Sequence, residues 1–230
     1  MNRIAIWAEP RTGSTYLVDV VTQYLYINNP GIPVYRQKEV IYHEYNTFVL
    51  NMNAGIPMCI RSHLEHFPYW EKLNLGQYIN NFYNIFLYRK NMFEQIVSNW
   101  IGNTTRVWAT NDRLTVQKLS QQTYTIPENE FLDLIQLRWT ELNNNYTKVN
   151  YDVTIVYEDL TFEYDTDIRS IGLIPDYPLT KQTRTQKLPK KQNQIENWNQ
   201  LKQIYMEEIS KYNSNNFYFD ENGMLYVNKK

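Results

Sequence analysis

A short segment near the amino terminus carries residue types that bind anions. Residues 9–16 read Glu-Pro-Arg-Thr-Gly-Ser-Thr-Tyr, in which Arg11 is a fixed cation whose fork geometry suits phosphate or sulfate oxygens. The apolar run before it predicts a buried strand, and the helical spacing of Leu17, Val21 and Leu25 predicts a helix after it. Backbone N–H groups and the helix dipole would then favour one anion at this turn. The same residues could also form an ordinary strand-to-helix turn with a Thr or Ser N-cap.

The segment is not a Walker A motif, because no lysine follows Gly13 and Pro10 stands where the first glycine would be. Residues 10–17 resemble instead the 5′-phosphosulfate loop of sulfotransferases that use 3′-phosphoadenosine 5′-phosphosulfate (PAPS). The motif shape is most similar to that of bacterial and phage-type members. The resemblance implies a P-loop-like sulfotransferase architecture, PAPS as sulfuryl donor and adenosine 3′,5′-bisphosphate (PAP) as product. It makes Arg11 a catalytic residue and implies these cofactor-binding residues in the loop: Arg11, Thr12, Gly13, Ser14, Thr15 and Tyr16.

A candidate general base follows a second predicted strand at 56–60. Residues 61–64, Arg-Ser-His-Leu, resemble the Lys-(Thr/Ser)-His-Leu segment of cytosolic sulfotransferases, whose histidine is the base. A neutral imidazole at His63 can take a hydroxyl proton near pH 7, although a histidine in this place can also be a hydrogen-bonded loop residue. In sulfotransferases whose loop carries arginine, the base is often a glutamate after the first helix. Glu39 and Glu44 are therefore alternatives, and either could equally be plain surface charge.

A third predicted strand, 83–88, ends at Arg89, and Ser98 lies on the helix expected to follow. This run resembles the 3′-phosphate motif of sulfotransferases, which implies that Arg89 and Ser98 bind one terminal phosphate. The alternative is a strand–helix joint with an exposed arginine. A fourth strand, at 152–157, leads into Glu-Asp-Leu, which resembles the end of the corresponding sulfotransferase strand. We expect the segment 157–160 to have a structural role at the phosphosulfate loop.

Two further segments are assigned to ligand binding. Residues 102–125 have little periodicity and are expected to be a loop insertion that binds the acceptor. Residues 179–194 are rich in lysine and resemble the basic loop that covers the nucleotide in several sulfotransferases. The resemblance implies that lysines of this loop contact the nucleotide, with Lys181 and Lys187 as candidates and the choice among the lysines of 181–191 left open. The alternative is a solvated basic loop.

The alternation of strands and helices predicts an α/β fold, an open parallel sheet of four to five strands flanked by helices, with its ligand at the carboxyl edge. We expect one domain over residues 1–230, ending in a hairpin. The 23 basic and 24 acidic residues nearly balance, so no global field favours nucleic acid or a membrane. The single cysteine, Cys59, and the lack of a signal peptide or a long apolar run predict a cytoplasmic protein. The few, scattered histidines predict no metal site.

These observations favour an enzyme, a PAPS-dependent sulfotransferase acting on the hydroxyl of a carbohydrate or another small molecule. One alternative is a non-catalytic protein that binds a nucleotide or a sulfated sugar. The other is a P-loop-type phosphotransferase, against which the missing Walker lysine counts. The acceptor and the oligomeric state cannot be read from the sequence, because the acceptor pocket would come from residues 34–50 and 102–124, which show no clear pattern.

Overall fold

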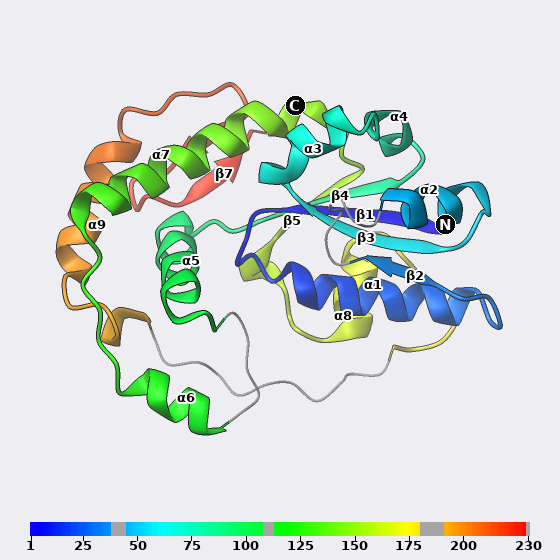
Figure 1. Cartoon of the computed structure of the whole chain (residues 1–230), viewed down its shortest axis with the longest axis horizontal. Coiled ribbons are helices and arrows are strands. Elements are labelled where there is room, and N and C mark those ends of the chain that lie inside the picture. Colours follow the sequence, from blue (N-terminus) through cyan, green and yellow to red (C-terminus); the bar gives the residue numbers. More distant parts are fainter. Residues whose placement is uncertain (38–44, 108–112, 180–190, 229–230) are drawn as a thin grey trace. The chain divides into compact units, whose positions relative to one another are not determined.

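The computed structural model describes residues 1–37, 45–107, 113–179 and 191–228 (Figure 1). The chain divides into two compact units. Unit 1 comprises Met1–Arg89 and Asn144–Lys181, and unit 2 comprises Lys90–Asn143 and Gln182–Lys230. Each unit is described by itself below. The prediction of one sulfotransferase-like domain over the whole chain stays a prediction.

Unit 1 is built on a sheet of five parallel strands in the order β2-β3-β1-β4-β5. The strands are β1 Arg3–Ala8, β2 Tyr35–Gln37, β3 Met58–His63, β4 Tyr83–Tyr88 and β5 Val153–Val156. Strands β1, β3 and β4 are buried almost throughout, as expected for parallel strands covered on both faces. The predicted open parallel α/β sheet is confirmed.

Two details of the sheet differ from the expectation. Strand β3 was expected to end at Ile60, but Arg61, Ser62 and His63 continue it by pairing with residues 6–8 of β1. The short strand β2 lies in the stretch 34–50, which showed no clear pattern, and it pairs with the first three residues of β3. In both places tertiary pairing decides the strand. The segments 61–63 and 35–37 are mostly polar, so they show no hydrophobic pattern that would identify a strand from the sequence.

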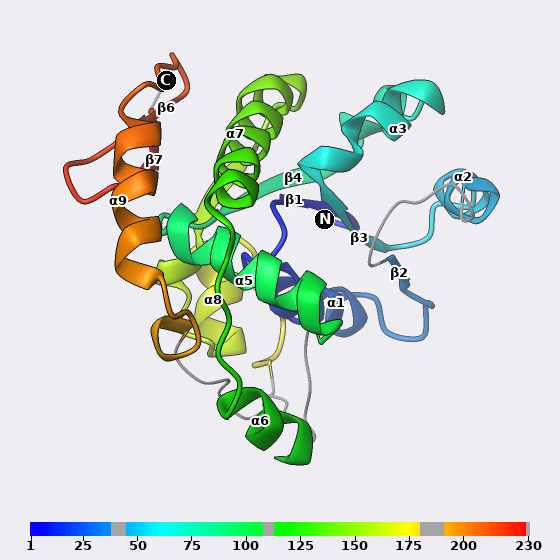
Figure 2. The same cartoon turned by 60° about the vertical axis from the view of Figure 1, so that its left-hand side comes forward.

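Helices lie on both faces of this sheet (Figures 1 and 2). Helix α1, Ser14–Asn28, and helix α8, Tyr164–Ser170, lie on one face, where they form a common core with Ile4, Ile6 and other strand residues. The other helices in the described part of unit 1 are α2 Tyr45–Asn53, η2 Leu64–His66, α3 Phe67–Lys72, α4 Gly76–Ile79, η3 Tyr146–Lys148 and η4 Tyr157–Asp159. Figure 1 shows α3 and α4 on the face opposite α1.

A buried carboxylate ties α1 to α8. Asp167 on α8 is 1% exposed and accepts a hydrogen bond of 2.5 Å from the hydroxyl of Tyr16 on α1. It also accepts bonds from the N–H and hydroxyl of Thr161 and from the N–H of Phe162. Four donors on two segments thus share one carboxylate, which holds the first turn of α1 against the chain that follows β5.

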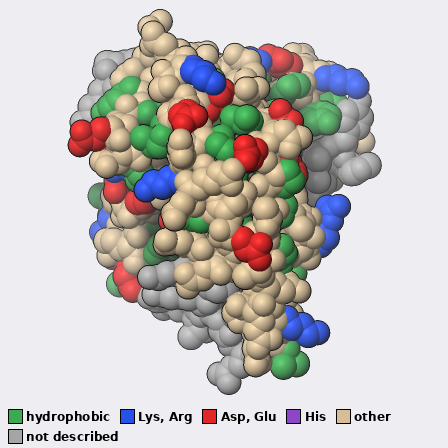
Figure 3. All heavy atoms as spheres, turned by 90° about the vertical axis from the view of Figure 1, so that its left-hand side faces the viewer, with side chains coloured by type: hydrophobic (Ala, Val, Ile, Leu, Met, Phe, Trp, Pro, Cys, Tyr) green, Lys and Arg blue, Asp and Glu red, His purple; other side chains and the backbone are tan. Residues whose placement is uncertain are grey.

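Unit 2 is helical with a terminal hairpin. Its elements are α5 Met92–Thr105, α6 Arg113–Ser120, most of α7 Glu128–Asn145, η5 Lys191–Asn193, α9 Trp198–Ile209, β6 Phe217–Phe219 and β7 Leu225–Val227. Strands β6 and β7 pair antiparallel, which confirms the predicted hairpin. Lysine, arginine and carboxylate side chains are interspersed over the face in Figure 3.

The segment 102–125 was expected to be a loop, and this was wrong for much of its length. Helix α5 continues to Thr105 and α6 occupies Arg113–Ser120. Leu119 on α6 is 8% exposed, and the buried Gln194 side chain donates a 2.7 Å hydrogen bond to its carbonyl. Helix α6 is short and its residues are polar on average, so no long apolar run marks it in the sequence. The acceptor-binding role of the segment stays a prediction.

Cys59 lies in the middle of β3 and is fully buried. Burial raises the pKa of its thiol to about 12, because the thiolate would lose its solvation. Since the thiolate is the reactive form, we expect native protein at pH 7–9 to resist a thiol reagent such as dithionitrobenzoate, and protein unfolded in guanidinium to react at once. Rapid stoichiometric labelling of the native protein would contradict this burial.

Candidate anion site at the carboxyl edge of the sheet

The three central strands of unit 1 end at the same level. Ala8, the last residue of β1, pairs with His63 on one side and with Leu87 on the other. Side chains alternate between the faces of a sheet, so Arg61 and His63 share the face of Ala8, which is the face that α1 covers. Arg89 follows β4 directly, two residues after Leu87. The fold therefore brings the predicted strand-end residues of unit 1 to one edge.

The loop between β1 and α1 has an unusual backbone. Arg11 and Gly13 have φ values of 67° and 77°, in the left-handed region that ordinary residues rarely adopt. The Thr12 hydroxyl points inward and donates a 2.8 Å hydrogen bond to the carbonyl of Glu9. The Gly13 carbonyl accepts the N–H of Tyr16 at 2.9 Å and so begins the helix.

The start of α1 matches an anion site better than a capped turn. The N-cap residue is Gly13, and no side chain caps the helix within the described residues. The first turn also contains no acidic residue. Within the described residues, the N–H groups and the positive end of the dipole there thus have neither a side-chain cap nor a carboxylate of the first turn beside them. The alternative of a Thr or Ser N-cap is excluded in this structure.

Arg61 braces the start of the helix, a role that the sequence reasoning missed. Its guanidinium donates to the Thr15 hydroxyl at 2.9 Å and to the Ser14 hydroxyl at 3.4 Å, although the residue is only 8% exposed. A hydroxyl that accepts from arginine still has its own proton to donate. Ser14 and Thr15 can therefore donate to an anion while Arg61 supplies positive charge behind them.

Arg89 is held by the segment after β5. Its guanidinium lies 5.0 Å from the ring centroid of Tyr157, and its Nε lies 3.5 Å from Glu158 Oε1. The Tyr157 ring in turn packs on Gly13, where an added Cβ would come within 2.7 Å of a ring carbon. One aromatic ring thus contacts both the loop and Arg89, in agreement with the structural role expected for residues 157–160.

Arg11 and Arg89 are close enough to affect each other's charge. Burial lowers the pKa of Arg11, and the positive charge of Arg89 lowers it further, while Tyr157 acts in the opposite direction. The two guanidinium groups therefore oppose each other electrostatically. A bound anion would relieve this repulsion, which is the arrangement expected of a site for phosphate or sulfate.

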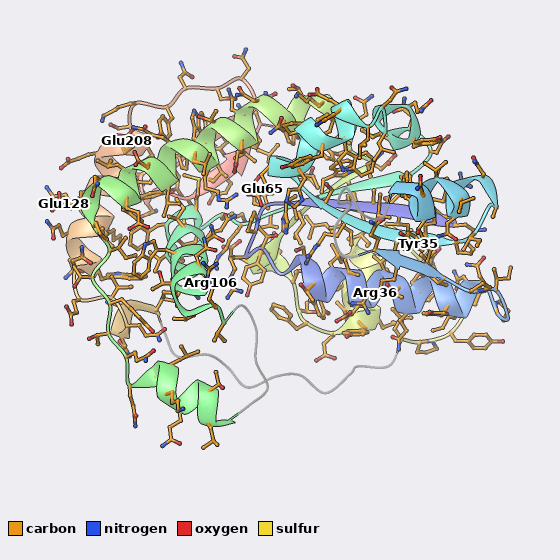
Figure 4. The ribbon with its side chains drawn as sticks, in the orientation of Figure 1. Tyr35, Arg36, Glu65, Arg106, Glu128 and Glu208 are labelled. Carbon is orange, nitrogen blue, oxygen red and sulfur yellow. The ribbon has the colours of Figure 1, made fainter. Side chains whose placement is uncertain are left out.

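His63 ends β3 with its ring in a defined orientation. Its Nδ1 lies 3.1 Å from the carbonyl oxygen of Ala8. A carbonyl only accepts, so in this contact Nδ1 is the donor, and the ring's other nitrogen is Nε2. The ring centroids of His66 and His63 lie 5.5 Å apart, and His66 Nε2 lies 3.6 Å from Glu65 Oε1. Figure 4 shows Glu65 at this carboxyl end of the sheet.

Among the other predicted site residues, Tyr16 faces the core, and the roles of the rest stay predictions. The Tyr16 side chain is 1% exposed and its hydroxyl is bonded to Asp167, so it faces the core and we leave it out of the ligand set. Ser98 lies on α5 in unit 2, whereas Arg89 belongs to unit 1, and their joint action on one phosphate stays a prediction. Glu39, Glu44, Lys181 and Lys187 lie outside the described residues.

Within the described ranges, no group of three or more His, Cys, Asp or Glu side chains is placed to hold a metal ion. No described helix has both the length and the apolar character needed to cross a membrane. Comparison of the chain with protein-family models, with curated proteins and with solved structures found no match.

Proposed function

We propose that the protein is a sulfotransferase that moves a sulfuryl group from PAPS to an acceptor hydroxyl. The observation that carries the proposal is the convergence of Arg11, Arg61 and Arg89 around the uncapped start of α1. A doubly charged phosphosulfate group and a separate 3′-phosphate would use more than one cation of this kind. The resemblance of the loop to the phosphosulfate loop then favours sulfuryl over phosphoryl transfer.

In the proposed reaction the acceptor oxygen attacks sulfur in line with the bond from sulfur to the bridging phosphate oxygen. That bond breaks as the new S–O bond forms, and PAP leaves with the bonding electron pair. His63 Nε2 takes the proton of the acceptor hydroxyl. Arg11, Arg61 and the donors at the start of α1 stabilise the negative charge that grows on the sulfuryl and bridging oxygens.

Arginine at position 11 differs from a lysine at this position in that it cannot act as a proton donor to the leaving group. A guanidinium does not lose its proton in proteins, so Arg11 can stabilise the leaving oxygen by charge and hydrogen bonds only. The proposal therefore assigns no general acid to the leaving group. The acceptor is proposed to be a carbohydrate or another small hydroxyl compound, and the location to be cytoplasmic.

PAP binding tests the nucleotide part of the proposal. We expect calorimetry to detect micromolar binding, and Arg89→Ala or Arg11→Ala to weaken it by about 1.5–3 kcal/mol, the range for a hydrogen bond to a charged group. Arg169→Ala removes an exposed arginine of α8 that pairs with Asp165, and it serves as the matched control. Binding of ATP in place of PAP would favour the phosphotransferase, and binding of neither would contradict any nucleotide role.

Turnover separates an enzyme from a binding protein. We expect wild type to release PAP from PAPS when phenol and saccharide acceptors are offered, and His63→Gln to lower the rate by about 100- to 10,000-fold. Glutamine can still donate to the Ala8 carbonyl but takes no proton at neutral pH. An unchanged rate in His63→Gln would remove His63 as the base and turn attention to Glu39 or Glu44. PAP binding with no turnover on any acceptor would favour the non-catalytic alternative.

A further inference from the structure

A second candidate site lies at the opposite edge of the sheet of unit 1. A pocket of about 470 Å³ is lined by residues 1–3 at the start of β1, by Gly55, by residues 80–83 at the start of β4 and by Asp152 before β5. These are the amino ends of the strands, at the end of the sheet marked N in Figure 1. A strand of six residues spans roughly 20 Å, so this pocket is separate from the arginine cluster. Its volume is in the range of small-molecule sites.

The pocket is lined by amide side chains that the fold leaves unused. Asn2, Asn80 and Asn81 are exposed, and their side chains make no hydrogen bond within the described residues. Each amide offers two donor protons and an acceptor oxygen. Three such groups on one pocket can form a network with a ligand that both donates and accepts.

The two charged side chains of the pocket are balanced and held in place. Arg3 donates a 2.7 Å hydrogen bond to the Met52 carbonyl, and Asp152 accepts the Asn84 N–H at 2.7 Å. An anionic ligand would meet the carboxylate of Asp152, and a cationic ligand would meet the guanidinium of Arg3. Side chains of both charge signs and three amides line the pocket, and this polar character matches a hydroxyl-rich ligand rather than an apolar one.

We propose that this pocket binds a neutral saccharide. Sugar hydroxyl groups donate and accept at once, as the amides of Asn2, Asn80 and Asn81 do, and a neutral sugar creates no conflict with Arg3 or Asp152. The site goes beyond the proposed sulfotransferase activity and does not rest on it. A sugar bound there would lie at the far edge of the sheet from Arg11.

Saturation-transfer NMR tests the proposal with glucose, galactose, N-acetylglucosamine, maltose and lactose, and with adenosine as an uncharged ligand that is not a sugar. Any affinity tag belongs at the carboxyl end, because residues 1–3 line the pocket. We expect at least one sugar to bind wild type, and the double variant Asn80→Ala/Asn81→Ala to bind it about tenfold more weakly or not at all. Asn199→Ala, which removes an exposed amide from α9, is the matched control and should bind as wild type does.

The variant Asn81→Trp fills the pocket and should block sugar binding by its bulk, so it tests the site without depending on lost hydrogen bonds. Thermal unfolding of each variant verifies that it is folded. Arg11→Ala should leave sugar binding unchanged, and the double asparagine variant should leave PAP binding unchanged, so the two proposals can fail separately. The saccharide proposal is overturned if no sugar binds wild type, if adenosine alone binds, or if bound sugar is indifferent to both pocket variants.

Discussion

Replacing Asp167 by alanine is expected to lower the free energy of unfolding by about 3–5 kcal/mol, because four donors, one of them the buried Tyr16 hydroxyl, lose their shared acceptor. The Tyr16 hydroxyl, the Thr161 N–H and hydroxyl, and the Phe162 N–H all donate to this carboxylate. Alanine would remove the acceptor from the Tyr16 hydroxyl inside the core and from the part-buried donors of Thr161 and Phe162. Denaturant unfolding followed by circular dichroism measures the loss.

Two companion variants locate the cause of the Asp167 effect. Tyr16→Phe removes one donor and leaves the carboxylate with its other three, so we expect a smaller loss of about 1.5–3 kcal/mol. Asp165→Ala removes an exposed carboxylate of the same helix, paired with Arg169, and should change stability far less. If Asp167→Ala and Asp165→Ala were equally mild, Asp167 would not be the anchor between α1 and α8.

Gly13→Ala is expected to damage the candidate anion site through two separate effects. Its φ of 77° costs an alanine about 1–2 kcal/mol in the left-handed region. The new Cβ would also lie 2.7 Å from a ring carbon of Tyr157, and relieving that overlap costs about 1–3 kcal/mol more. Because the Tyr157 ring also contacts Arg89, we expect PAP binding to fall together with stability.

Gly31 provides the matched control for this prediction. Its φ of 78° is nearly the same, but nothing lies within 4 Å of an added Cβ, so Gly31→Ala reports the backbone strain alone. The pair Gly13→Ala and Tyr157→Ala, made singly and together, measures the overlap as a coupling energy. If Gly13→Ala and Gly31→Ala lowered the free energy of unfolding equally, and Gly13→Ala showed no coupling to Tyr157→Ala, the close packing of the Tyr157 ring on the loop would be refuted.

The parts of the fold that could be predicted are those encoded locally. The apolar runs at 3–7 and 83–88 are long enough to identify buried strands, and the spacing of Leu17, Val21 and Leu25 identifies α1. The loop between β1 and α1 was identified by its residue types, because glycine, arginine and hydroxyl residues between a strand and a helix form a pattern within one stretch of sequence.

The contributions of Arg61, Tyr157 and Asp167 could not be predicted in the same way. Arg61 was read as a variant of a motif lysine, and only the pairing of β3 beside β1 places it against Ser14 and Thr15. One signal was available, since Arg61 and His63 are two residues apart and so share a face of a strand. Tyr16 was assigned to the ligand, yet its partner Asp167 lies 151 residues away in the sequence.

The sequence by itself therefore determined the class of fold, the position of the loop between β1 and α1 that is proposed to bind an anion, and the residue types that could act there. It did so because strand and helix periodicity and turn chemistry depend on neighbours within a few positions. Only the tertiary structure decided which cation braces the loop, which nitrogen of His63 contacts the Ala8 carbonyl and which tyrosine belongs to the core. Those outcomes depend on contacts between segments far apart in the chain, such as β1 with β3 and α1 with α8, and no local pattern records them.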